Sequence, residues 1–140
     1  MNRLVDIINT EVSTEAITAN IQYQFWPEQP WKNQMEIVYN DMFENRDNQS
    51  DEAQYIRYYY FGQLINETLR QYSRKTQEIQ RELARSKGIT SIRRYYILAR
   101  RIYRLLQKCG LRKAYNFQRI TYYDLVHLRE EEIKEILRRI

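Results

Sequence analysis

Glycine and proline are scarce in this chain, and this limits what it can fold into. Three glycines and two prolines occur among 140 residues, and both prolines lie close together, at positions 27 and 30. Proline is excluded from helix interiors and glycine weakens a helix, so long stretches without them favour uninterrupted helices. The sequence therefore predicts an all-α fold.

Apolar residues recur at helical spacing in four segments after residue 32. We expect helices over about 34–46, 51–87, 91–109 and 122–140. Gly88 and Gly110 are typical stop signals, and a short helical turn is expected at 111–118. Four helices with short connections predict a four-helix bundle.

Two segments carry typical helix-start residues. Asn33 followed by Glu36 indicates an N-cap for the first helix, and Thr121 with Asp124 resembles a capping box. The last helix is expected to run from there without a break to Ile140.

The first 32 residues differ from the rest. Their first part spaces apolar residues at roughly helical intervals but is rich in Thr, Asn, Val and Ile, which are indifferent helix formers. Pro27 and Pro30 then stand among aromatic residues, including Tyr23 and Trp31, in a stiff strap. We expect residues 1–32 to form an N-terminal arm that orders on a partner, and residues 33–140 to form the bundle domain.

Charge is distributed very unevenly. Residues 1–50 carry a net charge of −5 and residues 51–140 a net charge of +10. Between Arg70 and Arg119 there are fifteen Arg and Lys residues against two Glu. A concentrated cationic region in a small helical protein indicates a polyanion as partner, and nucleic acid is the commonest one.

The segment 91–109 concentrates this charge on one side of a helix. Placing residues 100° apart gathers its apolar residues on one face and six cations on the other, and the segment contains no acid. The cations of this first set are Arg93, Arg94, Arg100, Arg101, Arg104 and Lys108. A second set on the preceding helix comprises Arg70, Arg74, Lys75, Arg81, Arg85 and Lys87, and Arg112 and Lys113 extend the track.

Three interpretations of the basic face remain open at this stage. Arginine forks onto phosphate oxygens, so a nucleic-acid backbone is the first. An acidic protein surface, including the chain's own acidic N-terminal part, is the second. A solvated face with ion networks is the third; it suits 70–85, where Glu67 and Glu78 share the face, better than 91–109.

Thirteen tyrosines invite a related question. Tyr58–Tyr60, Tyr95–Tyr96 and Tyr122–Tyr123 have rings that stack on unpaired bases in some proteins. Amphipathic rings more often fill helix interfaces, so we expect Tyr95, Tyr96 and Tyr103 to be packing residues. Duplex binding through phosphates is then the preferred mechanism.

No residue pattern indicates catalysis. The single histidine, His127, has no second ligand at metal-binding spacing, and Cys109 is expected to act as a small core residue. The acidic group at 130–135 is interleaved with cations and is expected to be a solvated face. We therefore predict a protein that is not an enzyme and has no metal and no cofactor.

Two other functions remain possible on the sequence alone. A helix-turn-helix around Gly110, with 95–109 followed by 111–118, would make the chain a sequence-specific DNA-binding regulator. A basic face against anionic lipid would make it a membrane-surface or scaffold protein.

Four stretches together resemble a known group: FWPEQPW, YIRYYYFGQLINETL, RRYYILARRIYRLL and EEEIKEILRRI. The chain is similar over its full length to the major coat (capsid) proteins of filamentous archaeal viruses of the lipothrixvirus type, such as the Acidianus filamentous viruses. The resemblance lies in overall character and length, so individual DNA contacts do not carry over.

This resemblance implies a structural virion protein, assembled in the host cytoplasm. It implies a four-helix bundle with an N-terminal arm, many copies of which wrap linear double-stranded DNA, held in A form, into a helical nucleocapsid. It also implies a heterodimer with a second related coat protein and contact with a lipid envelope.

Overall fold

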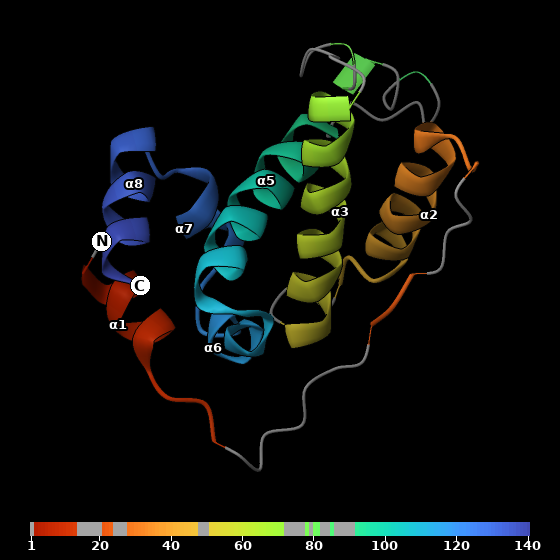
Figure 1. The fold of residues 1–140 in the computed structure, drawn as a ribbon. Coiled ribbons are helices and arrows are strands. Elements are labelled where there is room, and N and C mark those ends of the chain that lie inside the picture. The colour runs from red at the N-terminus through yellow and green to blue at the C-terminus, as the bar shows by residue number, and fades with distance from the viewer. Residues whose placement is uncertain are drawn as a thin grey trace.

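The central helix of the fold is α3 (Glu52–Gln71), which packs against α5 (Ile92–Cys109) and, on another side, against α2 (Trp31–Glu44) (Figure 1). These positions come from a computed structural model that describes residues 2–13, 21–23, 28–47, 51–71, 78, 80, 81, 85 and 92–140. Every regular element within these ranges is helical. The all-α prediction is therefore confirmed.

The remaining elements gather at one side of α5. They are α1 (Asn2–Asn9), the 3₁₀ turn η1 (Leu111–Lys113), α6 (Ala114–Phe117), α7 (Tyr122–Val126) and α8 (Glu130–Arg139). Figure 1 shows α1 and α8 together, with the two ends of the chain close to each other. The Asn9 side chain donates a hydrogen bond to the carbonyl oxygen of Arg139 at 2.9 Å, which links these ends.

The core follows the apolar faces predicted for the second and third helices. Phe61 and Ile65 of α3 and Ala99 and Ile102 of α5 have no exposed surface. Leu64 on the flanking strip of α3 is also buried, so α3 is covered on more than one side, as expected. The part predicted at 72–87 lies outside the described residues, except for positions 78, 80, 81 and 85, which are helical.

The first predicted helix is present, but it begins three residues earlier. Asn33 lies inside α2 and is not its N-cap; Pro30 occupies that position, with φ −58° and ψ 143°, and makes no side-chain cap. Its carbonyl oxygen accepts the Gln34 amide at 3.2 Å, so the backbone closes the first turn without a capping side chain. Of the predicted apolar stripe, Phe43 is partly exposed, at 37%. The buried members are Met35, Val38, Tyr39 and Met42.

The prediction of one helix over 122–140 is wrong. Thr121 caps α7 as expected, accepting the Asp124 amide at 3.1 Å, but that helix ends at Val126. The chain then extends, and Arg129 takes an extended conformation from which α8 starts. The Arg129 amide donates to Glu132 Oε1 at 3.0 Å, which satisfies the new helix start and lowers the pKa of Glu132. The break lets Leu128 turn into the core, where it is 8% exposed.

Residues 2–13 do not stand apart from the bundle as the expected arm. Leu4, Val5, Ile7 and Ile8 of α1 are buried in the same core as the other helices. The helix packs against α6 and α8, elements more than 100 residues away in the sequence. The apolar spacing was visible in the sequence, but the surface it packs against is formed by residues from the other end of the chain.

The described part of the aromatic strap packs on the bundle of its own chain. Tyr23 donates a hydrogen bond to Asp41 Oδ2 at 2.6 Å, and its ring meets that of Tyr60 edge to face at 5.7 Å. Trp31 is half-buried against the core at the start of α2. Phe25 and Trp26 lie outside the described residues.

Candidate nucleic-acid interface

The basic face of α5 separates into an exposed part and a half-buried part. Arg93, Arg94 and Lys108, near its two ends, are exposed. Arg100, Arg101 and Arg104, in the middle, are half-buried because α7 and α8 lie against this stretch. The amphipathic pattern of the sequence therefore placed all six side chains on one helix, but tertiary packing gives them different roles.

Arg101 is part of the fold. Its Nη1 donates hydrogen bonds to the carbonyl oxygens of Leu125 and Val126, both at 2.6 Å. These carbonyls belong to the last turn of α7 and have no partner within that short helix, so the guanidinium supplies one. Burial lowers the pKa of Arg101, and the nearby Glu130 carboxylate opposes that effect.

Arg104 has an acidic partner, which the sequence did not reveal. Its Nη1 lies 2.9 Å from Glu130 Oε1 at the first position of α8. The segment 91–109 itself has no acid, but the fold brings one in from 26 residues further on. The positive charge of this flank is therefore compensated at Arg104 by a residue of the chain's own C-terminal helix. Because the two side chains are 34% and 55% exposed, the pair contributes little to stability.

A pocket of about 300 Å³ lies at this place. Arg100, Arg101 and Arg104 line it together with Glu130, and the sides of Tyr96 and Ile97 form its apolar wall. A second hollow on the other side of α5, lined by residues of α3 and α5, also includes Arg100 and contains Arg70 at the end of α3. Arg100 thus stands between two open regions of the surface.

The second predicted set is described only in part. Arg70, Arg81 and Arg85 are exposed helical residues. Arg74, Lys75 and Lys87 lie outside the described residues. Among the described members, Arg70 shares its hollow with Arg100, so here the structure brings the two sets together.

Arg112 and Lys113 hold the N-terminal segment. Arg112 Nη2 donates to the carbonyl oxygen of Ser13, and Lys113 Nζ to that of Thr10, both at 2.7 Å. The Asn116 side chain also donates to the Thr10 carbonyl oxygen, at 2.6 Å, so these contacts fasten the chain that follows α1. The sequence suggested that Arg112 and Lys113 extend the basic track. In the structure both side chains instead bind backbone carbonyls of the N-terminal segment.

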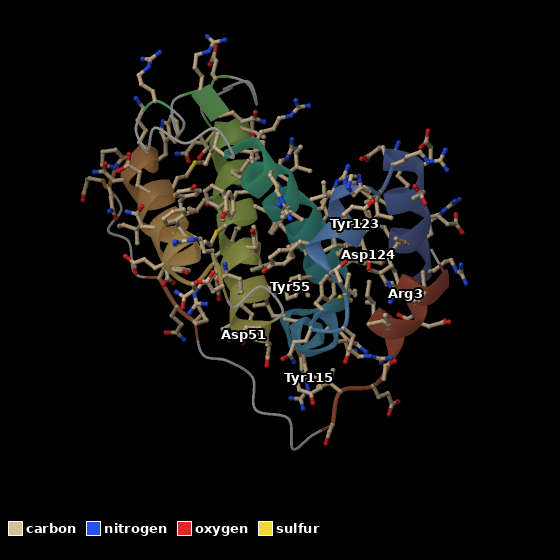
Figure 2. All side chains as sticks on the ribbon, turned by 180° about the vertical axis from the view of Figure 1, so that it is seen from behind. Arg3, Asp51, Tyr55, Tyr115, Tyr123 and Asp124 are labelled. Carbon is tan, nitrogen blue, oxygen red and sulfur yellow. The ribbon has the colours of Figure 1, made fainter. Side chains whose placement is uncertain are left out.

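Two further ionic contacts could not be identified from the sequence. Arg3 of α1 lies 2.7 Å from Asp124 of α7, and Figure 2 shows the two side chains facing each other across these helices. Arg57 of α3 lies 3.0 Å from Asp41 of α2, the same carboxylate that accepts from Tyr23. In both pairs a basic and an acidic residue meet over a long sequence separation, which no local spacing encodes.

The tyrosines act mainly as packing residues where the structure describes them. Tyr58 and Tyr96 are buried, and Tyr95 and Tyr103 are half-buried. The rings of Tyr58 and Tyr95 stack at 6.2 Å, and Tyr59 meets Tyr103 at 5.2 Å. The expectation that Tyr95, Tyr96 and Tyr103 pack rather than stack on bases agrees with this burial.

Among the described tyrosines, two face solvent. Tyr115 and Tyr123, both labelled in Figure 2, are 45% and 68% exposed. The ring of Tyr123 lies 4.1 Å from that of His127 at the end of α7. His127 thus belongs to an exposed aromatic pair.

The described residues hold no group of His, Cys, Asp and Glu arranged to bind a metal ion. Cys109 is half-buried at the end of α5, and burial raises its thiol pKa to about 11. Three of the four acidic residues of α8 pair with cations: Glu130 with Arg104, Glu132 with Arg129, and Glu135 with Arg138.

The segment after Gly110 folds into η1 and α6, as the predicted helical turn requires. However, α6 has only four residues and buries three of them: Ala114, Asn116 and Phe117. A recognition helix needs an exposed face that reaches into the major groove. The geometry therefore does not favour the helix-turn-helix interpretation.

None of the described helices combines the length and apolar character that would let it span a membrane. Comparisons with protein-family models, curated protein sequences and solved structures find no match to this chain. The resemblance to filamentous-virus coat proteins is therefore a sequence-based prediction, and the function has to be argued from the surface itself.

Proposed function

We propose that this chain is a non-enzymatic structural protein that binds double-stranded DNA through the exposed cations of α5 without sequence specificity. The observation that carries the proposal is the state of Arg93, Arg94 and Lys108. All three are exposed, and none makes an ion pair with a carboxylate in the described part of the chain. Uncompensated cations on one helix face suit a phosphate backbone, which presents charge at regular intervals.

The mechanism of binding is electrostatic. Phosphate contacts position a protein on a duplex but carry no sequence information, which suits the packaging of a whole genome. Arg70, which shares a hollow with Arg100 between α3 and α5, extends the contact surface from α5 to the end of α3. Arg112 and Lys113 bind backbone carbonyls of the N-terminal segment, so we assign them a supporting role.

We further propose, from the sequence resemblance, that the chain is a viral coat protein. In this proposal the four longest described helices, α2, α3, α5 and α8, are the four-helix bundle, and the residues that precede α2 form its N-terminal element. Many copies, with a second related coat protein, would form a helical nucleocapsid on linear duplex DNA in the virion, and an envelope would surround the filament.

A salt titration of duplex binding tests the DNA part of this proposal. The logarithm of the affinity should fall linearly with the logarithm of the salt concentration, with a slope that counts neutralised phosphates, at about 0.9 per phosphate. Duplexes of unrelated sequence should bind equally well. A flat salt response, or strong preference for one sequence, would contradict it.

Electron microscopy tests the coat part. The purified protein mixed with linear duplex DNA should give filaments of constant width, with or without the second coat protein. Salt-dependent binding that never produces regular filaments would leave DNA binding intact and reject the coat function.

A further inference from the structure

The pocket between α5 and α8 already contains a carboxylate at the position where an anion would bind. Arg104 Nη1 donates to Glu130 Oε1 at 2.9 Å. Arg101, which binds only backbone carbonyls, lines the same pocket, so one negative charge faces two positive ones. The pocket thus has positive charge left over after the ion pair has formed.

Arg101 is held in place before any ligand arrives. Its two hydrogen bonds to Leu125 and Val126 both come from Nη1. Its Nε and Nη2 groups make no hydrogen bond within the part of the chain that the structure describes. A guanidinium fixed by the fold, with donors to spare at a pocket, loses little freedom when it binds an anion.

The Arg104–Glu130 pair can be exchanged at low cost. Both partners are partly exposed, and such pairs are weak because water competes for each charge. A phosphate offers arginine two oxygens in a geometry that matches the guanidinium fork. A phosphate close to the pocket therefore competes effectively with the single carboxylate oxygen that Arg104 now contacts.

We propose that this pocket is a phosphate subsite, and that Glu130 occupies it until a backbone phosphate of DNA replaces its carboxylate on Arg104. The inference rests on the proposed function, because it names the place on α5 where one phosphate of the bound duplex sits. The subsite lies between the exposed Arg93–Arg94 pair and the exposed Lys108, in the middle of the basic face.

Glu130 and its neighbour Glu131 provide a matched test. Both are exposed acids in the first turn of α8, but Glu131 lies outside this pocket and lines another hollow with Lys134. Glu130→Gln and Glu131→Gln therefore remove the same charge from the same turn. Affinity for a short fluorescent duplex is measured by anisotropy at several salt concentrations, with circular dichroism to verify folding.

We expect E130Q to tighten duplex binding about two- to fivefold, the range expected when a competing exposed ion pair is removed. E131Q should change affinity less than E130Q at every salt concentration. Glu130→Asp, which keeps the charge but shortens the side chain, should fall between wild type and E130Q. Arg104→Gln should weaken binding more in the E130Q background than in the wild type, because only there is Arg104 free of its carboxylate.

Three results would overturn the subsite. Equal gains in E130Q and E131Q would mean that only net charge matters, with DNA binding itself intact. Weaker binding by E130Q would mean that the carboxylate positions Arg104 for the duplex. A wild-type protein without salt-dependent duplex binding would reject the proposed function and the subsite together.

Discussion

Gly62 of α3 lies directly against the backbone of Ala99 on α5. A Cβ atom at position 62 would clash with the Ala99 carbonyl oxygen and would lie 2.6 Å from Tyr103 Cβ. Both contacts are shorter than van der Waals separation, and one involves backbone that cannot rotate away. The missing side chain therefore sets how closely the two central helices approach.

Gly62→Ala should destabilise the protein by about 2–3 kcal/mol, as overpacking at a tight contact does. The sign of the change in unfolding free energy is informative, because replacing glycine with alanine at an unobstructed helix position would instead stabilise the protein by about 1 kcal/mol. Urea unfolding measures the difference. Gln63→Ala, at the next position of α3, is the control and should stay within about 0.5 kcal/mol of wild type. A stabilised Gly62→Ala variant would show that the helices are further apart.

Two tyrosines in ring contact should respond in opposite ways to loss of the hydroxyl. Tyr55 and Tyr122 meet edge to face at 5.2 Å. The Tyr55 hydroxyl donates to the carbonyl oxygen of Ile120, whereas the buried Tyr122 hydroxyl has no hydrogen-bond partner in the described part of the chain. Tyr55→Phe should cost about 1 kcal/mol, and Tyr122→Phe should be neutral or stabilising. Thermal unfolding of the two variants measures both effects. Equal losses of stability would contradict this assignment of the two hydroxyl groups.

Alkaline pH should unfold the protein cooperatively. Burial raises the pKa of Tyr39 from 10.0 to about 12, and it raises those of Tyr55, Tyr58 and Tyr122 further. Because the unfolded chain ionises first, this stability is fully present below the ordinary tyrosine pKa of 10.0 and is lost as pH rises through about 12. Tyrosinate absorbance and helical circular dichroism should therefore change together. Gradual ionisation of these tyrosines while the helices stay intact would contradict the burial of their side chains.

The sequence was sufficient to predict the bounds of a helix that is strongly amphipathic. The segment 91–109 was predicted within one residue of α5, because its apolar and basic faces alternate without interruption. Thr121 could also be identified as a cap, because the whole signal lies within four residues of the sequence. The sequence did not predict a helix end that depends on a residue distant in the chain. The end of α7 depends on Arg101, which lies 24 residues away from Leu125.

The candidate site shows the same division. The six cations of α5 could be placed on one face from their spacing, and Arg93, Arg94 and Lys108 are exposed there. The spacing could not show that Arg101 binds carbonyls or that Arg104 meets Glu130, since both partners come from the C-terminal helices. A surplus of charge can be counted in a sequence, but which charges stay uncompensated depends on tertiary contacts.

Arg101 should therefore matter for stability more than the other cations of its face. Arg101→Gln removes the donor to two carbonyls at the end of α7 and should cost about 1–3 kcal/mol. Arg93→Gln, an exposed residue on the same helix, is the control and should change stability by less than about 0.5 kcal/mol. Denaturant unfolding of the two variants measures both effects. Equal stability would mean that water replaces the guanidinium at the carbonyls without cost.

The exposed cations of α5 should contribute to duplex DNA binding and not to the stability of the fold. Replacing Arg93 and Arg94 together with Gln should reduce the salt slope of duplex binding by roughly two, because each phosphate contact contributes about 0.9. The control removes two positive charges elsewhere, by Lys32→Gln in α2 and Arg46→Gln in the turn that follows it, both exposed positions outside α5. If net charge alone attracts the duplex, the two double variants will bind alike. If the face of α5 touches the phosphates, only the first will lose slope, while both keep the thermal unfolding temperature of the wild type.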